Sequence, residues 1–297
     1  MDLSLEAIKH RNSVRSFNGQ PLDSAEILAL EAAFDECSPG PFGGTARFVL
    51  VSASAAGFIK GAESNHSISG KIGTYGLVTK VPAFLVGSIR QAPWAFEDFG
   101  YSMEGLVLRC TDLGLDSCWI GGVFDRSAAG RALSRRDDEF MPAIVAIGRP
   151  AEKANMAVLL VRMAARADTR KPFGTLFFDG DFSHGLSDMD PWFDVLDAVR
   201  LGPSASNKQP WRIVRDLSSG FPRFHLYLEE DKIYNSLLGE TKIQNVDMGI
   251  AMRHFEAAAH ALGLPGSWKR EDPEPISVSS PKSYISTWDS SEPTGRS

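Results

Sequence analysis

The chain has 297 residues, 43% of them hydrophobic, and a formal net charge of −6. That length supports one large domain or two ordinary ones, and the composition is that of a globular protein. The negative charge gives no attraction to nucleic acid or to anionic membrane surfaces, so neither is an expected partner. The sequence has no signal-peptide pattern, no apolar run long enough to span a membrane, and three cysteines without CxxC spacing. We therefore expect a cytoplasmic protein with reduced thiols.

The first half of the sequence alternates helical and strand patterns. Apolar residues at helical spacing predict helices over 3–10 and 21–34, and Asp23 followed by Glu26 has the spacing of a capping box. Residues 46–52 are apolar and β-branched, which favours a strand. A longer helix that ends at a glycine and two flanking strands are predicted further on, over 97–115, 81–89 and 141–150.

The second half begins with a region of linker-like composition over 166–193. Within 192–264 the pattern then predicts a helix, two strands and a second helix. From residue 271 onward, proline, serine and charged residues dominate. Such a segment has too little apolar content to offset the entropy of ordering it, so an extended or poorly ordered tail is expected over 271–297.

Two stretches of the second half match two stretches of the first half without gaps and in the same order. The aligned pairs are 98–119 with 247–268, and 37–51 with 201–215. Asp98 meets Asp247, and Trp119 meets Trp268. Two amphipathic helices that both end in Leu-Gly-Leu can align by chance, but the additional matching segment favours an internal duplication.

The most specific string in the sequence is PSASNKQPW, over residues 203–211. Its proline and small hydroxyl residues favour an exposed turn between a helix and a strand. Asn207 and Gln209 add amide donors and acceptors that a polar ligand requires. Composition alone is also satisfied by an ordinary turn without a ligand.

This string and RNSVRSF, over residues 11–17, resemble two motifs of the flavin-dependent nitroreductase family. The first resembles the segment beside the flavin, and the second resembles the Arg-x-Ser-x-Arg/Lys-x-Phe segment that binds the flavin phosphate. The order of a helix, a Leu-Gly-Leu turn, CWIGG, a strand and RKPF adds to a resemblance that covers most of 1–270. It implies an α+β fold of mixed sheets flanked by helices, with FMN as cofactor and NADH or NADPH as transient reductant.

In that family the two motifs come from different subunits of a homodimer, whereas each occurs once in this chain. The first half has SPGPFGGTA where the second half has PSASNKQPW, and the second half has no Arg-x-Ser segment. The resemblance therefore implies a single-chain pseudo-dimer with one intact composite FMN site, and a monomer in solution. Its first half would span 1–175, and its second half, intertwined with the first, would span 176–270. A related group within the family is similarly built.

The resemblance implies a role for each motif residue. Arg11 is the first candidate for the FMN phosphate, because a guanidinium pairs with phosphate through two hydrogen bonds. Ser13 would bind the phosphate or the ribityl chain, and Arg15 would reach the pyrimidine edge, where positive charge stabilises the reduced ring. The other candidates are Arg170 and Lys171 at the phosphate, Trp119, Gly121 and Gly122 near one ring face, and Ser204, Ser206 and Asn207 near the ribityl chain or ring edge. Pro203 belongs to the same cofactor-binding segment, in which Gln209 and Trp211 would support the turn. The CWIGG segment departs from the family in lacking a Pro and a Glu-Gly pair.

No side-chain nucleophile or acid is required, because the flavin carries the chemistry. The expected activity is ping-pong reduction of a flat electron-poor acceptor, such as a nitroaromatic or a quinone. Two alternatives remain open: a flavin-binding or flavin-free relict that acts as a sensor or scaffold, and a flavin enzyme of another outcome, such as flavin destruction or ring oxidation. The acidic run over 179–190 lacks EF-hand spacing, so no metal site is expected.

Overall fold

The structure is a computed structural model that describes residues 3–52, 67–69, 72, 74, 78–122, 124–152, 169–231, 242–270 and 282–290. The chain divides into two compact units, each described separately below. The first unit holds His10–Asp168, and the second holds Thr169–Ser297 together with Asp2–Lys9. The helix α1 (Leu5–His10) ends where the first unit begins.

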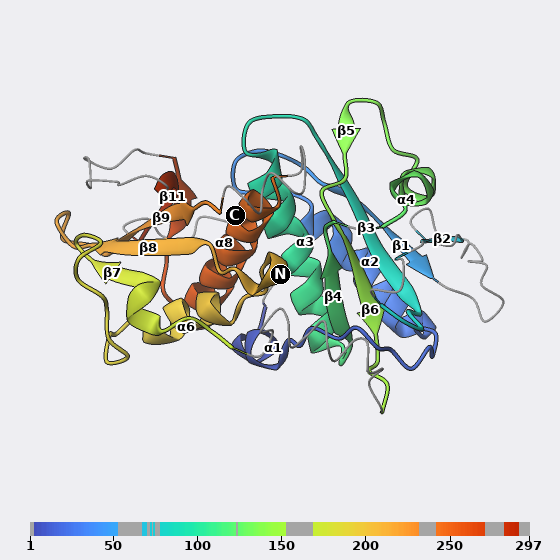
Figure 1. Cartoon of the computed structure of the whole chain (residues 1–297), viewed down its shortest axis with the longest axis horizontal. Helices are drawn as coiled ribbons and strands as arrows, with labels where there is room; N and C mark the ends of the chain where they lie inside the picture. Colours follow the sequence, from blue (N-terminus) through green and yellow to red (C-terminus); the bar gives the residue numbers. More distant parts are fainter. Residues whose placement is uncertain are drawn as a thin grey trace. The chain divides into compact units, whose positions relative to one another are not determined.

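The first unit is built on a mixed sheet with the strand order β2-β1-β3-β6-β4, and β5 pairs with β3. β2 runs parallel to β1, and the other neighbours along this path are antiparallel. Its strands are β1 (Arg47–Ser52), β2 (Ser67–Ser69), β3 (Ala83–Arg90), β4 (Asp116–Ile120), β5 (Glu139–Phe140) and β6 (Ile144–Gly148). Its helices are α2 (Ser24–Cys37), α3 (Ala95–Asp112) and α4 (Arg126–Leu133), and Figure 1 labels them.

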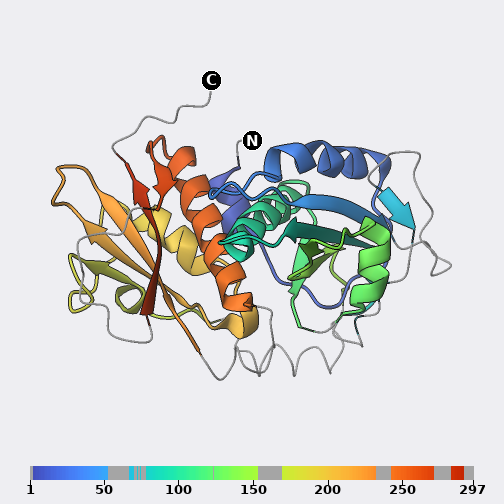
Figure 2. The same cartoon turned by 90° about the horizontal axis from the view of Figure 1, so that it is seen from above.

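Both faces of this sheet are covered, which explains why β1 is buried along its whole centre. Phe48 packs against Phe34 of α2, with ring centroids 5.9 Å apart. Successive side chains of a strand point to opposite faces, so Val49 and Val51 lie on the other side, in a cluster that includes Ala129 of α4. Figure 2 shows α2 above the strands of this unit and α4 below them. The strand is therefore apolar at consecutive positions instead of alternating.

The second unit is built on a sheet with the strand order β10-β11-β9-β8-β7. β7 runs parallel to β8, and the remaining neighbours are antiparallel. Its strands are β7 (Phe177–Asp179), β8 (Trp211–Asp216), β9 (Arg223–Glu229), β10 (Ser267–Lys269) and β11 (Lys282–Asp289). Its helices are α6 (Phe193–Leu201) and α8 (Ile243–Ala261), with the short 3-10 turns η1 (Phe173–Thr175) and η2 (Ala205–Asn207).

An aromatic cluster on α8 forms the core of the second unit. The ring of Phe255 lies 5.2–6.1 Å from the rings of four other aromatic residues, namely Trp192, Phe224, Trp268 and Trp288. Aromatic side chains bury large apolar areas, so this cluster fixes α8 against the sheet.

Four strands of each sheet follow the same order, β1-β3-β6-β4 in the first and β8-β9-β11-β10 in the second, and the last two strands of each set follow the long helix, α3 or α8. The parallel edge strands differ, because β2 lies between β1 and β3 in the sequence whereas β7 precedes β8. The long helices also end alike: Leu115 N–H donates to Cys110 C=O at 2.9 Å, and Leu264 N–H donates to Ala259 C=O at 2.8 Å. The intervening Gly114 and Gly263 have φ of +74° and +70°, which are Schellman turns. These matches support the internal duplication proposed from the sequence alignment.

The α+β fold class and several predicted elements are confirmed. Asp23 caps α2 in a capping box with Glu26, the two hydrogen bonds being 2.9 and 2.8 Å long. The linker-like reading of 166–193 was wrong for 173–179, where η1 and β7 form because buried Leu176 and Phe177 anchor them. Among the described residues, no helix is both long enough and apolar enough to cross a membrane.

Of the two expectations for the tail over 271–297, extended or poorly ordered, the second was wrong for residues 282–289. They form β11, which pairs with both β9 and β10. The strand carries the buried side chains of Ile285 and Trp288, and it hydrogen-bonds along both edges. Cross-strand pairing stabilises a polar sequence that has little tendency to order on its own. The other parts of the expected tail lie outside the described residues.

Candidate flavin site

The Arg-x-Ser segment of the first unit adds an extended stretch to the edge of the sheet at β4. Val14 N–H donates to Ser117 C=O at 2.9 Å, next to an isolated parallel bridge between Ser13 and Ser117. Val14 and Phe17 are buried and anchor the segment. The backbone that carries Arg11, Ser13 and Arg15 is therefore held by the fold. The side chains of Ser13 and Arg15 are half-buried.

Arg11 is a buried cation that the described residues satisfy only in part. The residue is 9% exposed, and its Nη1 donates to Ser13 Oγ at 3.1 Å. Its Nε is buried and has no hydrogen-bond partner in the part of the chain described. Burial lowers the pKa of Arg11, and the nearby carboxylates of Glu104 and Asp116 act in the opposite direction. A guanidinium has five N–H donors, so this one has free capacity for an anion.

Glu104 is a site residue that the motifs did not reveal. It lies on α3, is fully buried, and its Oε2 accepts the indole N–H of Trp119 at 2.7 Å. Trp119, one of the predicted residues, is thus oriented by this bond on the sheet edge. A glutamate on the core-facing side of a predicted helix was the available signal, since buried carboxylates need partners.

The two predicted glycines follow β4 directly. Gly121 C=O accepts a hydrogen bond from Arg126 Nη2 at 3.1 Å, and Gly122 is exposed. Gly121 and Trp119 lie on the same short stretch as Ser117, which pairs with the Arg-x-Ser segment. The structure therefore places five of the six predicted residues of the first unit along or just beyond the β4 edge of its sheet, whereas Arg15 C=O accepts a hydrogen bond from Thr79 N–H, ahead of β3.

Residues 203–209 of the second unit, hereafter the 203–209 loop, adopt a strained conformation. Ser206, Asn207 and Gln209 have φ of +49°, +54° and +47°, the left-handed region that residues with a Cβ rarely occupy. Residues in such conformations cluster at ligand-binding sites, where surrounding contacts hold them.

Side-chain hydrogen bonds join the 203–209 loop to the predicted basic pair. Asn207 Nδ2 donates to Thr169 C=O at 2.8 Å, and Gln209 Oε1 accepts the backbone N–H of Lys171 at 2.9 Å. Arg170 Nη2 donates to Leu201 C=O at 3.2 Å. The 203–209 loop and the basic pair, which the sequence suggested separately as site residues, therefore lie next to each other in the second unit. Gln209 supports the turn, as expected, and it is buried.

Two further hydrogen bonds of the loop lie within the second unit. Gln209 N–H donates to Ser204 Oγ at 2.9 Å, and Pro203 is buried beside it. Ala205 N–H donates to Asp247 Oδ1 of α8, also at 2.9 Å. Burial raises the pKa of Asp247 to about 8, with the hydrogen bond from Ala205 opposing the rise. Asp247 was aligned with Asp98 from the sequence, but its contact with the motif was not foreseen.

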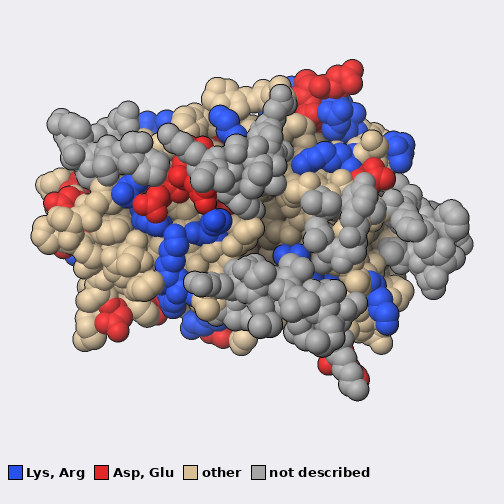
Figure 3. All heavy atoms as spheres, in the orientation of Figure 1, with Lys and Arg blue, Asp and Glu red and all other residues tan. Residues whose placement is uncertain are grey.

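Several cations surround the start of β8. Lys208 Nζ pairs with Asp231 at 2.8 Å, and the buried Arg212 pairs with Glu229. Burial lowers the pKa of Lys171, and the positive charges of Arg212 and Lys208 lower it further. In Figure 3, lysine and arginine side chains gather with a few acidic ones over the region of β8. The local charge is favourable for a phosphate.

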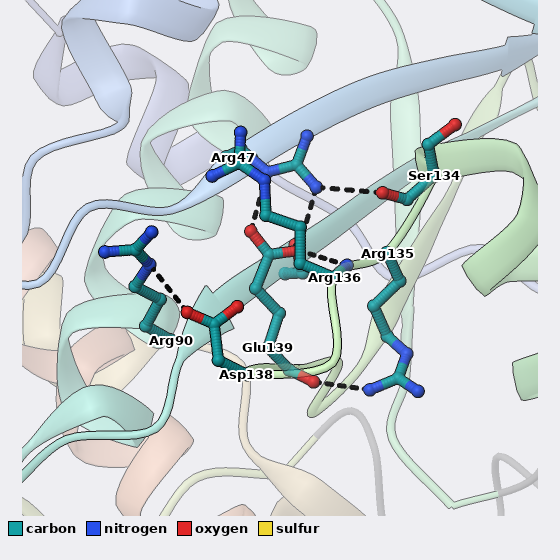
Figure 4. Close-up of polar contacts among 8 residues, drawn as sticks. Arg47, Arg90, Ser134, Arg135, Arg136, Asp138 and Glu139 are labelled. Carbon is teal, nitrogen blue, oxygen red and sulfur yellow. Dashed lines mark hydrogen bonds and ion pairs between the residues drawn. The ribbon is translucent and has the colours of Figure 1, made fainter.

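A second polar cluster, in the first unit, is structural. Figure 4 shows Glu139 of β5 held by Arg47, whose Nε and Nη2 donate to its two oxygens at 2.7 and 2.8 Å. Ser88 Oγ and Arg136 N–H donate to the same carboxylate, each at 3.0 Å. The hydrogen bond from Arg47 is the main cause that lowers the pKa of Glu139 to about 2. The Glu139 carboxylate accepts from Arg47, Ser88 and Arg136, so the cluster joins β1, β3 and β5 and has a structural role.

Comparisons with known proteins place the chain in a family. The model of the family described as "Putative TM nitroreductase" matches residues 4–259, so the chain belongs to this nitroreductase family. A search of curated protein sequences gave no match.

A solved structure described as a putative nitroreductase from Thermotoga maritima is 16% identical, with a TM-score of 0.56 over 97% of this chain and 93% of that chain. The chain thus has the fold of that structure. A nitroreductase with bound FMN from Bacteroides fragilis is 21% identical, with a TM-score of 0.37 over 51% of this chain and 90% of that chain. An FMN-dependent nitroreductase from Clostridium difficile is 16% identical, with a TM-score of 0.38 over 51% of this chain and 91% of that chain.

Proposed function

We propose that the protein is an FMN-dependent NAD(P)H oxidoreductase. Family membership and the fold support an oxidoreductase of the nitroreductase kind. The observation that carries the cofactor assignment is Arg11, a buried guanidinium whose Nε lacks a partner among the described residues. Burial lowers the pKa of Arg11 despite the nearby carboxylates of Glu104 and Asp116, so a further anion would stabilise its charged form, and the FMN phosphate is an anion of charge near −2.

The chain's own residues would bind and orient the cofactor. Arg11 and Ser13 would hold the phosphate, with Arg170 and Lys171 as further cations. Arg15 would face the pyrimidine edge of the ring. Ser204, Ser206 and Asn207 would contact the ribityl chain or ring edge, and the left-handed loop would expose backbone N–H groups. Trp119, fixed by Glu104, and Gly121 with Gly122 would lie near a ring face, where glycine lets backbone approach closely.

Bound FMN would accept a hydride from NADH or NADPH and transfer it, in a second half-reaction, to a flat electron-poor acceptor such as a nitroaromatic or a quinone. No described residue needs to act as an acid or nucleophile for this transfer. The residues' contribution is binding, orientation and charge, and positive charge from Arg15 would favour the reduced ring.

The test compares FMN with riboflavin, which lacks the phosphate, in wild type and Arg11→Ala. Wild type should bind FMN at least about tenfold more tightly, and Arg11→Ala should lose that preference while riboflavin affinity stays within about twofold. Arg90→Ala, which removes the same charge from an exposed pair with Asp138, is the matched control and should change neither affinity. Equal weakening of both ligands by Arg11→Ala would contradict a phosphate contact.

A further inference from the structure

A pair of aligned aspartates makes the same kind of contact in both units. In the first unit, Asp98 of α3 accepts the N–H groups of Phe42 and Gly44 at 2.8 and 2.7 Å. In the second unit, Asp247 of α8 accepts the N–H of Ala205 at 2.9 Å. Each aspartate thus fixes the loop that joins a helix to a central strand, α2 to β1 in the first unit and α6 to β8 in the second.

The two aspartates hold loops of different content. Residues 39–45, hereafter the 39–45 loop, contain glycines where the 203–209 loop contains side chains. A Cβ added at Gly40 or Gly44 would lie 2.4 or 2.5 Å from Asp98, so the 39–45 loop packs directly on that carboxylate. The 203–209 loop keeps Ser204 and Lys208 at the aligned positions, and it has three residues with a Cβ in the left-handed region.

The contact between Asp247 and Ala205 satisfies only one oxygen of a buried carboxyl group, which lowers the stability of the fold. It is 2% exposed, and its Oδ2 is buried without a hydrogen-bond partner in the described chain. A half-satisfied buried carboxyl is unfavourable for stability compared with an apolar residue. Asp98, in contrast, uses both oxygens. The contact of Asp247 therefore has a use that stability does not explain.

The same face of α8 also contacts the chain two residues after the end of β9. Gln244, three residues before Asp247 and thus its neighbour on the helix, is 1% exposed, and its Oε1 accepts the N–H of Asp231 at 3.0 Å. The carboxylate of Asp231 pairs with Lys208 Nζ. Through Asp247 and Gln244, one helix face thus fixes Ala205 directly and Lys208 indirectly.

We propose that Asp247 is a positioning residue for the cofactor: its hydrogen bond to Ala205 N–H holds the 203–209 loop in the left-handed conformation that contacts FMN. This inference rests on the proposed function. Asp98 makes the equivalent contact in a loop without the motif, so its role is confined to the stability of the first unit. An asparagine at 247 presents the same oxygen to Ala205 and preserves the contact.

The experiment measures FMN affinity and amide hydrogen exchange in Asp247→Ala, Asp247→Asn and Asp98→Ala. Asp247→Ala should raise the Kd for FMN about tenfold or more and accelerate exchange over 203–209, because the loop loses its acceptor. Asp247→Asn should restore both to within about twofold of wild type. Asp98→Ala should accelerate exchange over 39–45 and leave the Kd for FMN within about twofold.

Three outcomes would overturn the proposal: an unchanged Kd in Asp247→Ala despite faster exchange, unchanged exchange over 203–209, or equal loss of FMN affinity in Asp98→Ala. Asp247→Leu keeps the volume and replaces Asp247→Ala if that variant does not fold. If wild type binds no FMN, the proposed function fails and the cofactor role of Asp247 fails with it. The exchange arm then reports separately whether Asp247 holds the loop.

Discussion

Trp119 donates its indole N–H to the carboxylate of Glu104 at 2.7 Å, and this carboxylate is fully buried on α3. Its negative charge interacts electrostatically with Arg11. The negative charge favours the protonated Arg11, whereas burial opposes it. The edge of the first sheet is therefore polar and incompletely satisfied without a ligand, and such sites are commonly less stable than apolar ones of the same shape.

Replacing Arg11 should affect both flavin binding and stability. Arg11→Met keeps much of the volume but removes the positive charge near the carboxylates of Glu104 and Asp116, so the midpoint of thermal unfolding of the flavin-free protein should fall. The same variant should weaken FMN binding by about 1.5–3 kcal/mol, the range for losing a hydrogen bond to a charged group. Calorimetry and fluorescence titration give the two quantities. A large drop in stability together with unchanged FMN affinity would make Arg11 structural.

Substitution of Gly40 should lower the stability of the fold because a side chain there would clash with Asp98, and not because of the backbone conformation. A Cβ there would lie 2.4 Å from the Asp98 side chain, so Gly40→Ala should lower the free energy of unfolding by about 1–3 kcal/mol in urea titrations. Gly130→Ala is the control: it lies in α4 with its nearest neighbour at 3.5 Å, and it should stabilise by about 0.5–1 kcal/mol. Equal effects at both positions would contradict the packing of the 39–45 loop.

Glu139 should contribute to acid sensitivity. Its pKa in the folded protein is about 2, below the value of about 4.3 in an unfolded chain. Its contribution is therefore complete above the unfolded value and is lost as the pH falls toward 2. Urea unfolding of wild type and Glu139→Gln between pH 2.5 and 7 should give stability differences that shrink with acidification, because protonation makes the two side chains alike. A constant difference across this range would show that Arg47 does not depress the pKa.

The oligomeric state follows from the proposal that both motifs act within one chain. We predict a monomer by light scattering on a sizing column at micromolar concentrations, with FMN affinity independent of protein concentration. A stable dimer whose flavin affinity falls on dilution would show that the two motifs are combined between chains instead.

The sequence predicted the elements that local chemistry determines. The capping box at Asp23 and the glycine ends of α3 and α8 depend on a few neighbouring residues, and they were identified from spacing. The alignment of Asp98 with Asp247 was also found from the sequence. Its meaning was not, because the bond to Ala205 joins positions 42 residues apart. β11 was missed for a related reason: its order comes from pairing with two other strands.

The measurement that tests the central claim most directly is the visible spectrum of the purified protein with FMN, followed by anaerobic addition of NADH and NADPH. The account predicts that FMN binds, that at least one nicotinamide bleaches its absorbance, and that a quinone or nitroaromatic restores it. Flavin that binds without bleaching would favour a sensor or scaffold. A protein that fails to bind FMN would contradict the account.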